Sequence, residues 1–191
     1  YAVLLLNACV PQVTPAAELQ ALDFSPAIPE GFTYADGSRP LTFPVDFGAH
    51  PDFRTEWWYY TGNLSTPEGR PFGFELTVFR VSLVPPTVDL PDDSAWYSES
   101  LYFAHFALSD IEANEFHAYE RYARPGPGLA GAQASPYRVW LEDWSIVETG
   151  KNSYRLQAAQ DGIAIDLNLT DEMGVILHGE TPATSTWNVV G

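Results

Sequence analysis

Apolar and polar positions alternate with a period of two along most of the chain from residue 56 onward. In residues 56–62, EWWYYTG, every second side chain from Glu56 falls on one face, and Trp57 starts the opposite face. Such alternation in an aromatic run is typical of a half-buried β-strand. Residues 72–81, FGFELTVFRV, alternate in the same way, and the turn sequence STPEG at 65–69 separates the two runs. The pattern therefore predicts a β-hairpin.

The same alternation returns in the middle and in the last third of the chain. Residues 100–108 (SLYFAHFAL) and 115–122 (EFHAYERY) predict a second hairpin. Three further strands are predicted at 138–148, 153–159 and 163–169, joined by short turn sequences. Together these runs indicate about seven antiparallel strands with no amphipathic helix between them.

Two stretches interrupt the strand pattern. Residues 84–95 contain three prolines and three aspartates, which predicts a long exposed loop. Residues 125–136, PGPGLAGAQASP, are rich in glycine and are expected to interrupt the chain before the last three strands. The expected fold is all-β: an antiparallel barrel or sandwich built from hairpins and meanders, with a barrel around a cavity as the better fit.

The amino terminus carries a feature of a different kind. An apolar run at residues 3–6 is followed by Asn7, Ala8 and Cys9, the only cysteine of the chain. This order resembles the lipobox at the end of a bacterial lipoprotein signal peptide, which has an aliphatic residue three before the cysteine and a small residue just before it. We expect a diacyl anchor on Cys9 to hold the protein on a membrane without spanning it. The alternatives are a buried core thiol and an accident of composition.

These features divide the chain into four parts. Residues 1–8 are expected to be the remnant of a signal peptide, and residues 9–40 to be the lipid-attachment cysteine with a flexible, proline-rich linker. Residues 41–179 hold the β-domain, and residues 180–191 are expected to begin a second half that this sequence lacks. The expected location is the bacterial cell envelope, as an exported, membrane-anchored lipoprotein on the periplasmic or the outer surface.

Composition narrows the range of partners. The chain has 25 acidic and 9 basic residues and a net charge of −16, which repels a phosphate backbone, so no nucleic-acid partner is expected. A single cysteine rules out an internal disulfide, and the four histidines lack the spacing of metal ligands, so no metal is expected. The phosphate loop, the dinucleotide fingerprint and the GxSxG motif are all absent from the sequence, so no cofactor is expected.

Glu56 is the first candidate for acid chemistry. It opens the aromatic strand on the face of Trp58 and Tyr60, where burial beside the rings would raise the pKa of the carboxyl and let it act as an acid. The alternative is a strand-end salt bridge to Arg54 or Arg80. Arg80 itself lies on the apolar face of its strand, where an arginine requires a carboxylate partner.

His105 is the second candidate. It lies in the middle of its predicted strand with Phe103 and Ala107 on the same face, where an imidazole could move protons inside an apolar pocket. The alternative is a histidine whose polar atoms are satisfied within the fold. Glu120 and Arg121, in an otherwise aromatic strand, are expected to form internal ion pairs that fix the register of the sheet.

Several runs of the chain, taken together, resemble one known family. The runs FPVDFGAHPDFRTEWWYYTGNL, RPFGFELTVFR, YFAHFALSD, ERYARPGPGLAGA and RVWLEDW are similar to the lipocalin-like family that includes AttH proteins and carotenoid 1,2-hydratases. The resemblance covers residues 43–179. It implies an exported protein of two lipocalin-like β-barrel halves, of which this chain would hold the first. It also implies a hydrophobic ligand, because related proteins cyclise or isomerise terpenoid and polyketide chains.

Two functions follow from the residues and the resemblance. The first is a lipid-anchored protein that binds a hydrophobic, lipid-like or isoprenoid-like molecule and works alongside a transport permease. The expected ligand-binding residues are Trp57, Trp58, Tyr60, Phe74, Arg80, Phe103 and Trp140. The alternative is a hydratase or cyclase that acts on a double bond of an acyclic terpenoid or carotenoid, with Glu56 or His105 as the acid. Since Cys9 indicates a lipoprotein and carotenoid chemistry needs no tether, the AttH-like branch is favoured.

Overall fold

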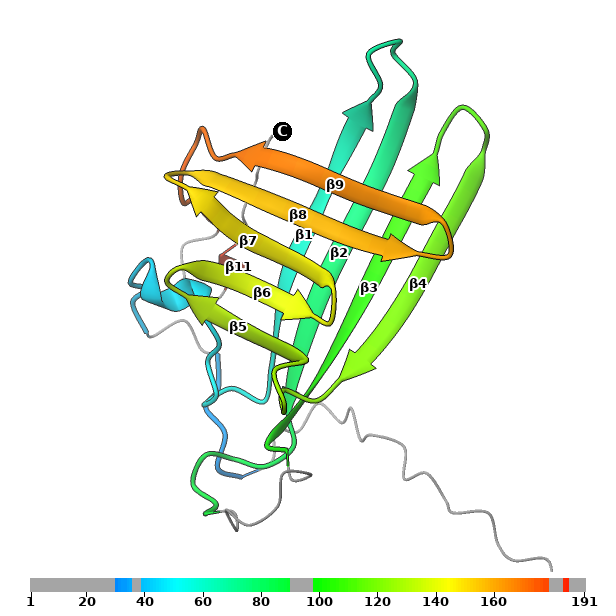
Figure 1. Ribbon diagram of the computed structural model, residues 1–191. Helices are drawn as coiled ribbons and strands as arrows, with labels where there is room; N and C mark the ends of the chain where they lie inside the picture. The colour runs from blue at the N-terminus through cyan, green and yellow to red at the C-terminus, as the bar shows by residue number, and fades with distance from the viewer. Residues whose placement is uncertain (1–29, 36–38, 90–97, 179–183, 186–191) are drawn as a thin grey trace, which may run out of the picture.

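The computed structural model describes residues 30–35, 39–89, 98–178 and 184–185. They form an almost entirely β structure of two antiparallel sheets that face each other, as Figure 1 shows. The predicted signal remnant, Cys9 and most of the predicted linker lie outside the described residues. Within the described residues, no helix has the length and apolar character needed to cross a bilayer.

The first sheet contains the two predicted hairpins, which are confirmed. Its strands follow the chain order as β1 (Thr55–Ser65), β2 (Pro71–Ser82), β3 (Ser100–Asp110) and β4 (Glu115–Ala123). The register runs without a break across β1 and β2, from Thr55 opposite Val81 to Ser65 opposite Pro71. Exposure alternates residue by residue along β1, so its even-numbered side chains face the second sheet.

The second sheet also follows the chain order. Its strands are β5 (Ala130–Ala134), β6 (Tyr137–Leu141), β7 (Trp144–Gly150), β8 (Ser153–Gln160) and β9 (Ile163–Thr170). The prediction of one strand over 138–148 is wrong. Leu141 pairs with Trp144, and the two-residue turn between them places Glu142 at a φ of 56°. Apolar residues flank this turn on both sides, which is why the alternation alone does not reveal it.

The strand β5 lies inside the glycine-rich stretch, which the sequence predicted to be an interruption. Its composition has a packing reason. Gly131 is paired with Trp140 on β6, and a Cβ atom on Gly131 would lie 2.5 Å from Cη2 of the indole. The indole of Trp140 therefore packs directly on the backbone of Gly131. Position 131 is a glycine because the indole of Trp140 occupies the space of a side chain. The segment therefore forms a strand although it is rich in glycine.

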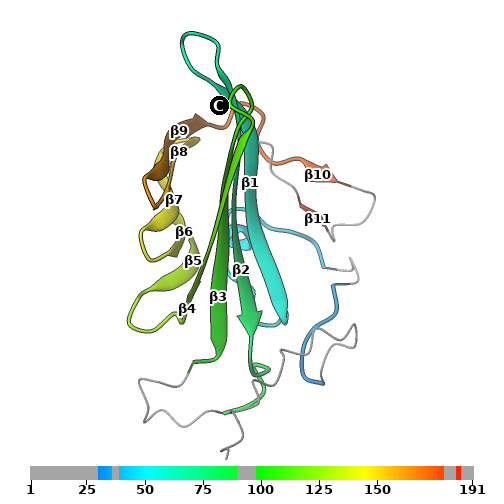
Figure 2. The same cartoon turned by 90° about the vertical axis from the view of Figure 1, so that its right-hand side faces the viewer.

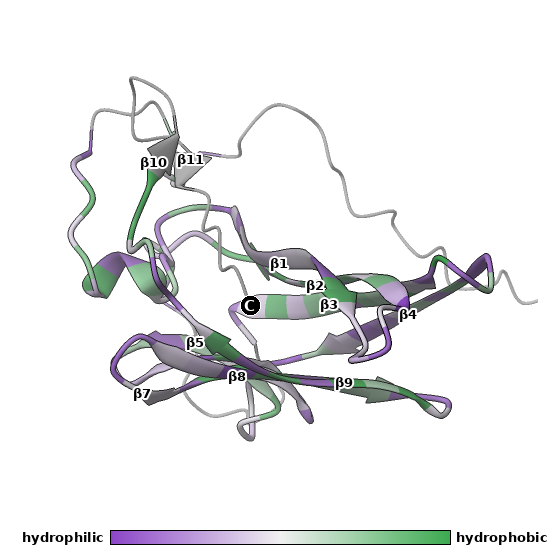
Figure 3. Cartoon of the chain, turned by 90° about the horizontal axis from the view of Figure 1, so that it is seen from above, coloured by the Kyte–Doolittle hydropathy of each residue, from purple (hydrophilic) through white to green (hydrophobic). Residues whose placement is uncertain are grey.

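Three short elements complete the described structure: the 3-10 turn η1 (Val45–Phe47), and β10 (Leu177–His178) paired with β11 (Thr184–Ser185). Turning the molecule shows that β10 and β11 lie on the opposite side of the β1–β4 sheet from the β5–β9 sheet (Figure 2). Seen from above, η1 sits at one end of the two layers, near β5 (Figure 3).

Of the two predicted architectures, the structure is a sandwich. In the described part of the chain, no strand of one sheet pairs with a strand of the other, so the expected closed barrel around a cavity is not formed. In Figure 1 the strands of the two sheets cross each other steeply, as in orthogonally packed sandwiches. The central space between them is filled by side chains from both inner faces.

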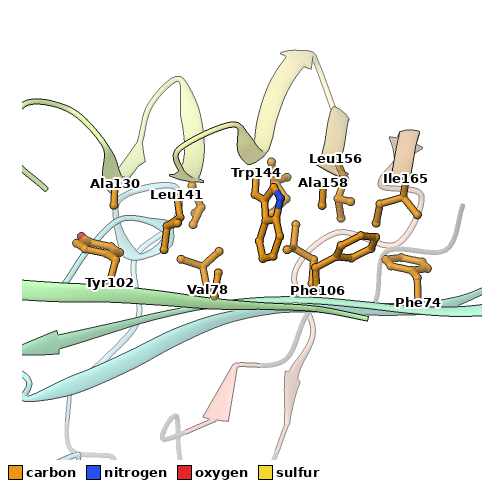
Figure 4. Close-up of a cluster of buried hydrophobic side chains, with 14 of the residues drawn as sticks. Phe74, Val78, Tyr102, Phe106, Ala130, Leu141, Trp144, Leu156, Ala158 and Ile165 are labelled. Carbon is orange, nitrogen blue, oxygen red and sulfur yellow. The ribbon is translucent and has the colours of Figure 1, made fainter. Parts of the chain in front are cut away.

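The core is one continuous layer between the sheets (Figure 4). Phe106 from β3 and Trp144 from β7 are both fully buried and meet edge to face, with ring centroids 5.7 Å apart. The indole N–H of Trp144 donates to the carbonyl of Ala159 at 2.9 Å, so its polar atom is satisfied inside the apolar layer. These large side chains occupy the volume that a central ligand cavity would need.

Replacement of Phe106 should therefore weaken the fold strongly. We expect Phe106→Ala to lower the free energy of unfolding by about 3–5 kcal/mol, because the substitution removes a buried ring and leaves a void beside Trp144. Urea denaturation measures the change. Phe116→Ala is the matched control: Phe116 is 69% exposed, so its removal should change the stability by less than about 0.5 kcal/mol. Equal losses in the two variants would contradict this account of the core.

Candidate functional site

The predicted ligand-binding residues do not share one surface. Four of them, Trp58, Tyr60, Phe74 and Arg80, alternate onto the inner face of the β1–β4 sheet. Trp57 and Phe103 lie on the outer face of the same sheet. Trp140 lies on the outer face of the second sheet, where the guanidinium of Arg138 stacks on its ring at 4.4 Å. The seven residues therefore cannot line one cavity, and a site must be sought on each face separately.

On the inner face, the start of β1 is covered by residues 45–50, which we call the strap. The strap consists of η1 and the three residues after it. The indole N–H of Trp58 donates to the carbonyl oxygen of Phe47 at 2.9 Å. The backbone N–H of His50 donates to the Glu56 carboxylate, with distances of 2.9 and 3.0 Å to its two oxygens. The aromatic strand thus holds the strap by its inward-facing side chains.

A charged cluster forms where the strap meets β1. The imidazole of His50 lies between two carboxylates, with Nδ1 2.9 Å from Oε2 of Glu56 and Nε2 3.0 Å from Oδ1 of Asp46. Arg80 forms an ion pair with Glu56 and also donates to the carbonyl oxygens of His50 and Phe53, at 2.6 and 2.9 Å. The cluster joins an acid–histidine–acid chain to a buried guanidinium.

The pKa shifts in this cluster follow from its geometry. The hydrogen bond with Glu56 raises the pKa of His50 above its usual value, and Asp46 adds to the rise, while burial opposes it. Burial raises the pKa of Glu56, but the hydrogen bonds from His50 and the positive charge of Arg80 outweigh burial and bring it below its usual value. Glu56 is therefore ionised at neutral pH.

The expectation of a raised pKa at Glu56 is thus wrong, because its neighbours are donors and a cation as well as rings. The alternative interpretation, an ion pair with Arg80, is what the structure shows. Sequence reasoning missed Asp46 and His50 altogether. Their spacing of four residues directly ahead of the aromatic strand was the available signal, since it places a carboxylate and an imidazole within reach of each other across one turn.

His105 lies on the outer face, away from this cluster. Its side chain is 39% exposed, and Nε2 is 3.2 Å from a carboxylate oxygen of Glu120, which is itself largely exposed. The ring lies 5.4 Å from that of Phe79 and 5.7 Å from that of Phe103. The apolar pocket expected around His105 is therefore not formed in the described structure. Arg121 does form the expected ion pairs, but with Glu142 and Asp143 of the second sheet.

The outer face carries a row of aromatic side chains across all four strands of the first sheet. Trp57, Phe79, Phe103 and Tyr122 are successive partners in the register, and we call them the outer aromatic row. The rings of Phe79 and Phe103 stack with centroids 4.4 Å apart. The row is exposed at both ends, since Trp57 is 61% and Tyr122 59% exposed. It offers apolar surface on the outer face of the first sheet.

A hollow does exist at the side of the sandwich, beneath the strap. We call it the tyrosine pocket, and its lining residues are Phe47, Tyr60, Tyr137, Ile146, Tyr154, Leu169 and Asp171. The centres of water-sized molecules can occupy about 30 Å³ of it. Since one water needs roughly 10–15 Å³ by this measure, the pocket has room for a small chemical group but not for a whole ligand.

The tyrosine pocket is apolar except for its hydroxyls and one carboxylate. The hydroxyls of Tyr60 and Tyr137 hydrogen-bond to each other, and the ring of Tyr137 packs edge to face against Phe47 and Tyr154, at 6.0 and 5.8 Å. Burial is the main cause that raises the pKa of both Tyr60 and Tyr137 well above the usual value. Both hydroxyls therefore keep their protons across the physiological range.

No group of three or more metal-ligating side chains with suitable geometry occurs among the residues that the structure describes. The cluster around His50 contains a cation that belongs to the protein, the guanidinium of Arg80, which forms an ion pair with Glu56. The cluster around His50 fixes the position of the strap. Through Phe47 it also fixes one wall of the tyrosine pocket.

The raised pKa of His50 predicts a pH dependence of stability. A pKa that is higher in the folded state gives stabilisation that is fully present below the unfolded value, about 6.5, and is lost as the pH rises through the folded value. The urea midpoint of the wild type should therefore fall as the pH rises above about 6.5, and His50→Gln should show a flatter profile.

His117→Gln is the control for this experiment, because His117 lies outside the cluster and contacts Glu115 on its own strand. This variant should keep the slope of the wild type. A wild-type slope in His50→Gln would show that the histidine does not couple the strap to β1.

Comparison with known proteins places the chain among its relatives. A family model described as AttH-like matches residues 34–187, which is most of the chain. A crystal structure of a Nitrosomonas europaea protein assigned to AttH shares 37% sequence identity and superposes with a TM-score of 0.62. The match covers 75% of this chain and 42% of that protein, so this chain spans less than half of its length. Among curated proteins, none matches. The family model and the solved structure agree, and the chain belongs to the AttH-like family.

Proposed function

We propose that this AttH-family chain is an exported, lipid-anchored protein that binds a hydrophobic, lipid-like or isoprenoid-like molecule and passes it to a transport permease. The observation that carries the proposal is the tyrosine pocket, an aromatic-lined hollow between the two sheets at the edge of β1. Small-molecule sites are commonly apolar hollows with a few well-placed polar groups. Because the pocket is small, only one end of the ligand enters it.

The remainder of the ligand then lies over the mouth of the pocket, against the strap. Phe47 lines the pocket from a single 3-10 turn, whereas most of the other walls come from the sheets. Its carbonyl is held by Trp58 and its neighbour Asp46 by His50, so the position of this ring is fixed through the charged cluster. The inward-facing side chains of β1 thus contribute to ligand binding by positioning Phe47, one wall of the tyrosine pocket.

The geometry supports binding better than acid catalysis. Protonation of an unactivated double bond requires a preorganised acid in a site that excludes water. Glu56 is ionised and paired with Arg80, and His105 is exposed to solvent on the other face of the sheet. Neither of the two candidate acids offers a protonated group inside an apolar pocket.

A titration with an isoprenoid alcohol tests the binding function and its location. We expect farnesol to bind the wild-type chain saturably in calorimetry. Tyr154→Leu should weaken the binding about tenfold, or about 1.4 kcal/mol, because it removes an aromatic wall of the pocket. Trp57→Leu makes the same type of change on the outer aromatic row and should leave the affinity unchanged.

The reverse result, with loss of affinity in Trp57→Leu alone, would move the ligand to the outer face of the sheet. Absence of saturable binding by the wild type would overturn the proposed function.

The membrane tether has its own test. In the native cells, the wild-type protein should fractionate with membranes and incorporate labelled palmitate, because acyl chains on Cys9 partition into the bilayer. Cys9→Ala should lose the label and leave the membrane fraction. Wild-type protein that carries no label would contradict the lipid anchor and leave the binding measurement standing.

A further inference from the structure

The two buried hydroxyls of the tyrosine pocket form an incomplete hydrogen-bonding pair. Tyr60 and Tyr137 each contribute one O–H donor, and the bond between their oxygens uses only one of the two. Within the described residues, each hydroxyl is hydrogen-bonded only to the other. One donor therefore has no acceptor among the described residues and is available to a ligand in the pocket.

We propose that the tyrosine pocket binds the uncharged, oxygen-bearing end of an apolar molecule, such as a ketone, an ester or an alcohol, by donating to its oxygen the O–H that the Tyr60–Tyr137 bond leaves unused. This inference rests on the proposed function and names the chemical class of its ligand. The carbonyl or hydroxyl oxygen of the ligand accepts the hydrogen bond, and its hydrocarbon part packs on the aromatic walls.

The size of the pocket fits this assignment. The space of about 30 Å³ for the centres of water-sized molecules matches a group of two or three heavy atoms rather than a ring or a branched chain. Three tyrosines and Asp171 supply its polar atoms, and Phe47, Ile146 and Leu169 supply purely apolar contacts. Such a lining accommodates a ligand with a small polar end joined to a hydrocarbon chain.

The charges around the pocket exclude a carboxylate or a phosphate at this end of the ligand. No lysine, arginine or histidine lines the pocket in the described part of the chain, whereas Asp171 does. Glu148 lies close by as well, because its carboxylate accepts the backbone N–H of Tyr137 at 2.9 Å. An anion would meet two negative charges, and a charged end of either sign would lose its hydration between neutral hydroxyls.

A matched series of six-carbon compounds tests the assignment. Hexan-2-one, hexane and hexanoate are titrated separately into the isotopically labelled 191-residue chain, and binding is followed by the chemical shifts of backbone amides. We expect hexan-2-one to bind about five- to tenfold more tightly than hexane, the value of one net hydrogen bond, and hexanoate to bind more weakly than the ketone. The shifts should concentrate at the strap and at the residues that line the pocket.

Two variants examine the hydroxyls directly. The double variant Tyr60→Phe/Tyr137→Phe removes both O–H donors and keeps both rings, and it should reduce the preference for hexan-2-one over hexane to less than about twofold. Tyr60→Phe alone leaves the Tyr137 hydroxyl as one donor without a partner hydroxyl, and it should keep the preference. In both variants the hexane affinity serves as the internal reference for an intact pocket. Tyr122→Phe, on the outer aromatic row, removes a hydroxyl bonded to Glu120 and should keep the full preference.

The outcomes separate this inference from the proposed function. Equal affinities of the wild type for hexane and hexan-2-one, or a full preference retained in the double variant, would overturn the hydrogen-bonded assignment while binding itself stands. Tighter binding of hexanoate than of the ketone would overturn the exclusion of anions. Failure of all three compounds to shift any pocket resonance would overturn the pocket as a ligand site, and the proposed function with it.

Discussion

The burial of Arg80 is the constraint on which the arrangement of the candidate site depends. A guanidinium buried on the inner face of a sheet is stable only when charge and hydrogen bonds surround it, and removal of one partner from such a pair typically costs several kcal/mol. Glu56 supplies the charge, and the carbonyl oxygens of His50 and Phe53 supply acceptors from the chain ahead of β1. Because Arg80 on β2 needs these partners, it fixes the path of the chain around the strap.

This constraint extends to the site through consecutive residues. Asp46, which binds His50, is followed directly by Phe47, whose ring lines the tyrosine pocket and whose carbonyl is held by Trp58. The inner face of one strand thus carries out three tasks in order: charge neutralisation at Glu56, fixing of the strap at Trp58, and a polar contact inside the pocket at Tyr60. Side chains fill the centre of the sandwich, and the tyrosine pocket lies at the side that the strap borders.

The alternation of residues was sufficient to predict the strands of the first sheet, because each is a regular two-residue repeat bounded by turn or loop sequences. It failed at Glu142, where apolar residues continue through a tight turn, and at β5, where Gly131 lacks a side chain because Trp140 occupies the space. It also could not choose the inner face of β3, since Phe103 on one face and Phe106 on the other are equally apolar. That ambiguity placed His105 in a pocket that it does not occupy.

The site was less predictable than the fold for a related reason. Glu56 and Arg80 were recognised as partners because both lie on regular strands, whereas Asp46 and His50 act from a turn whose path no periodicity describes. Pairing across the two sheets is also invisible to local patterns, so the contact between Tyr60 and Tyr137, 77 positions apart, emerges only from the packed structure.

The fit between Gly131 and Trp140 has a consequence for how the sequence can vary. Any side chain at position 131 would collide with the indole, and a smaller residue at position 140 would uncover the glycine backbone to water. Gly62 and Phe74 stand in the same relation on the first sheet, where a Cβ atom would lie 2.8 Å from the phenyl ring. Neither member of such a couple can change alone without loss. Among relatives of this chain, each glycine and its aromatic partner should be inherited, or replaced, together.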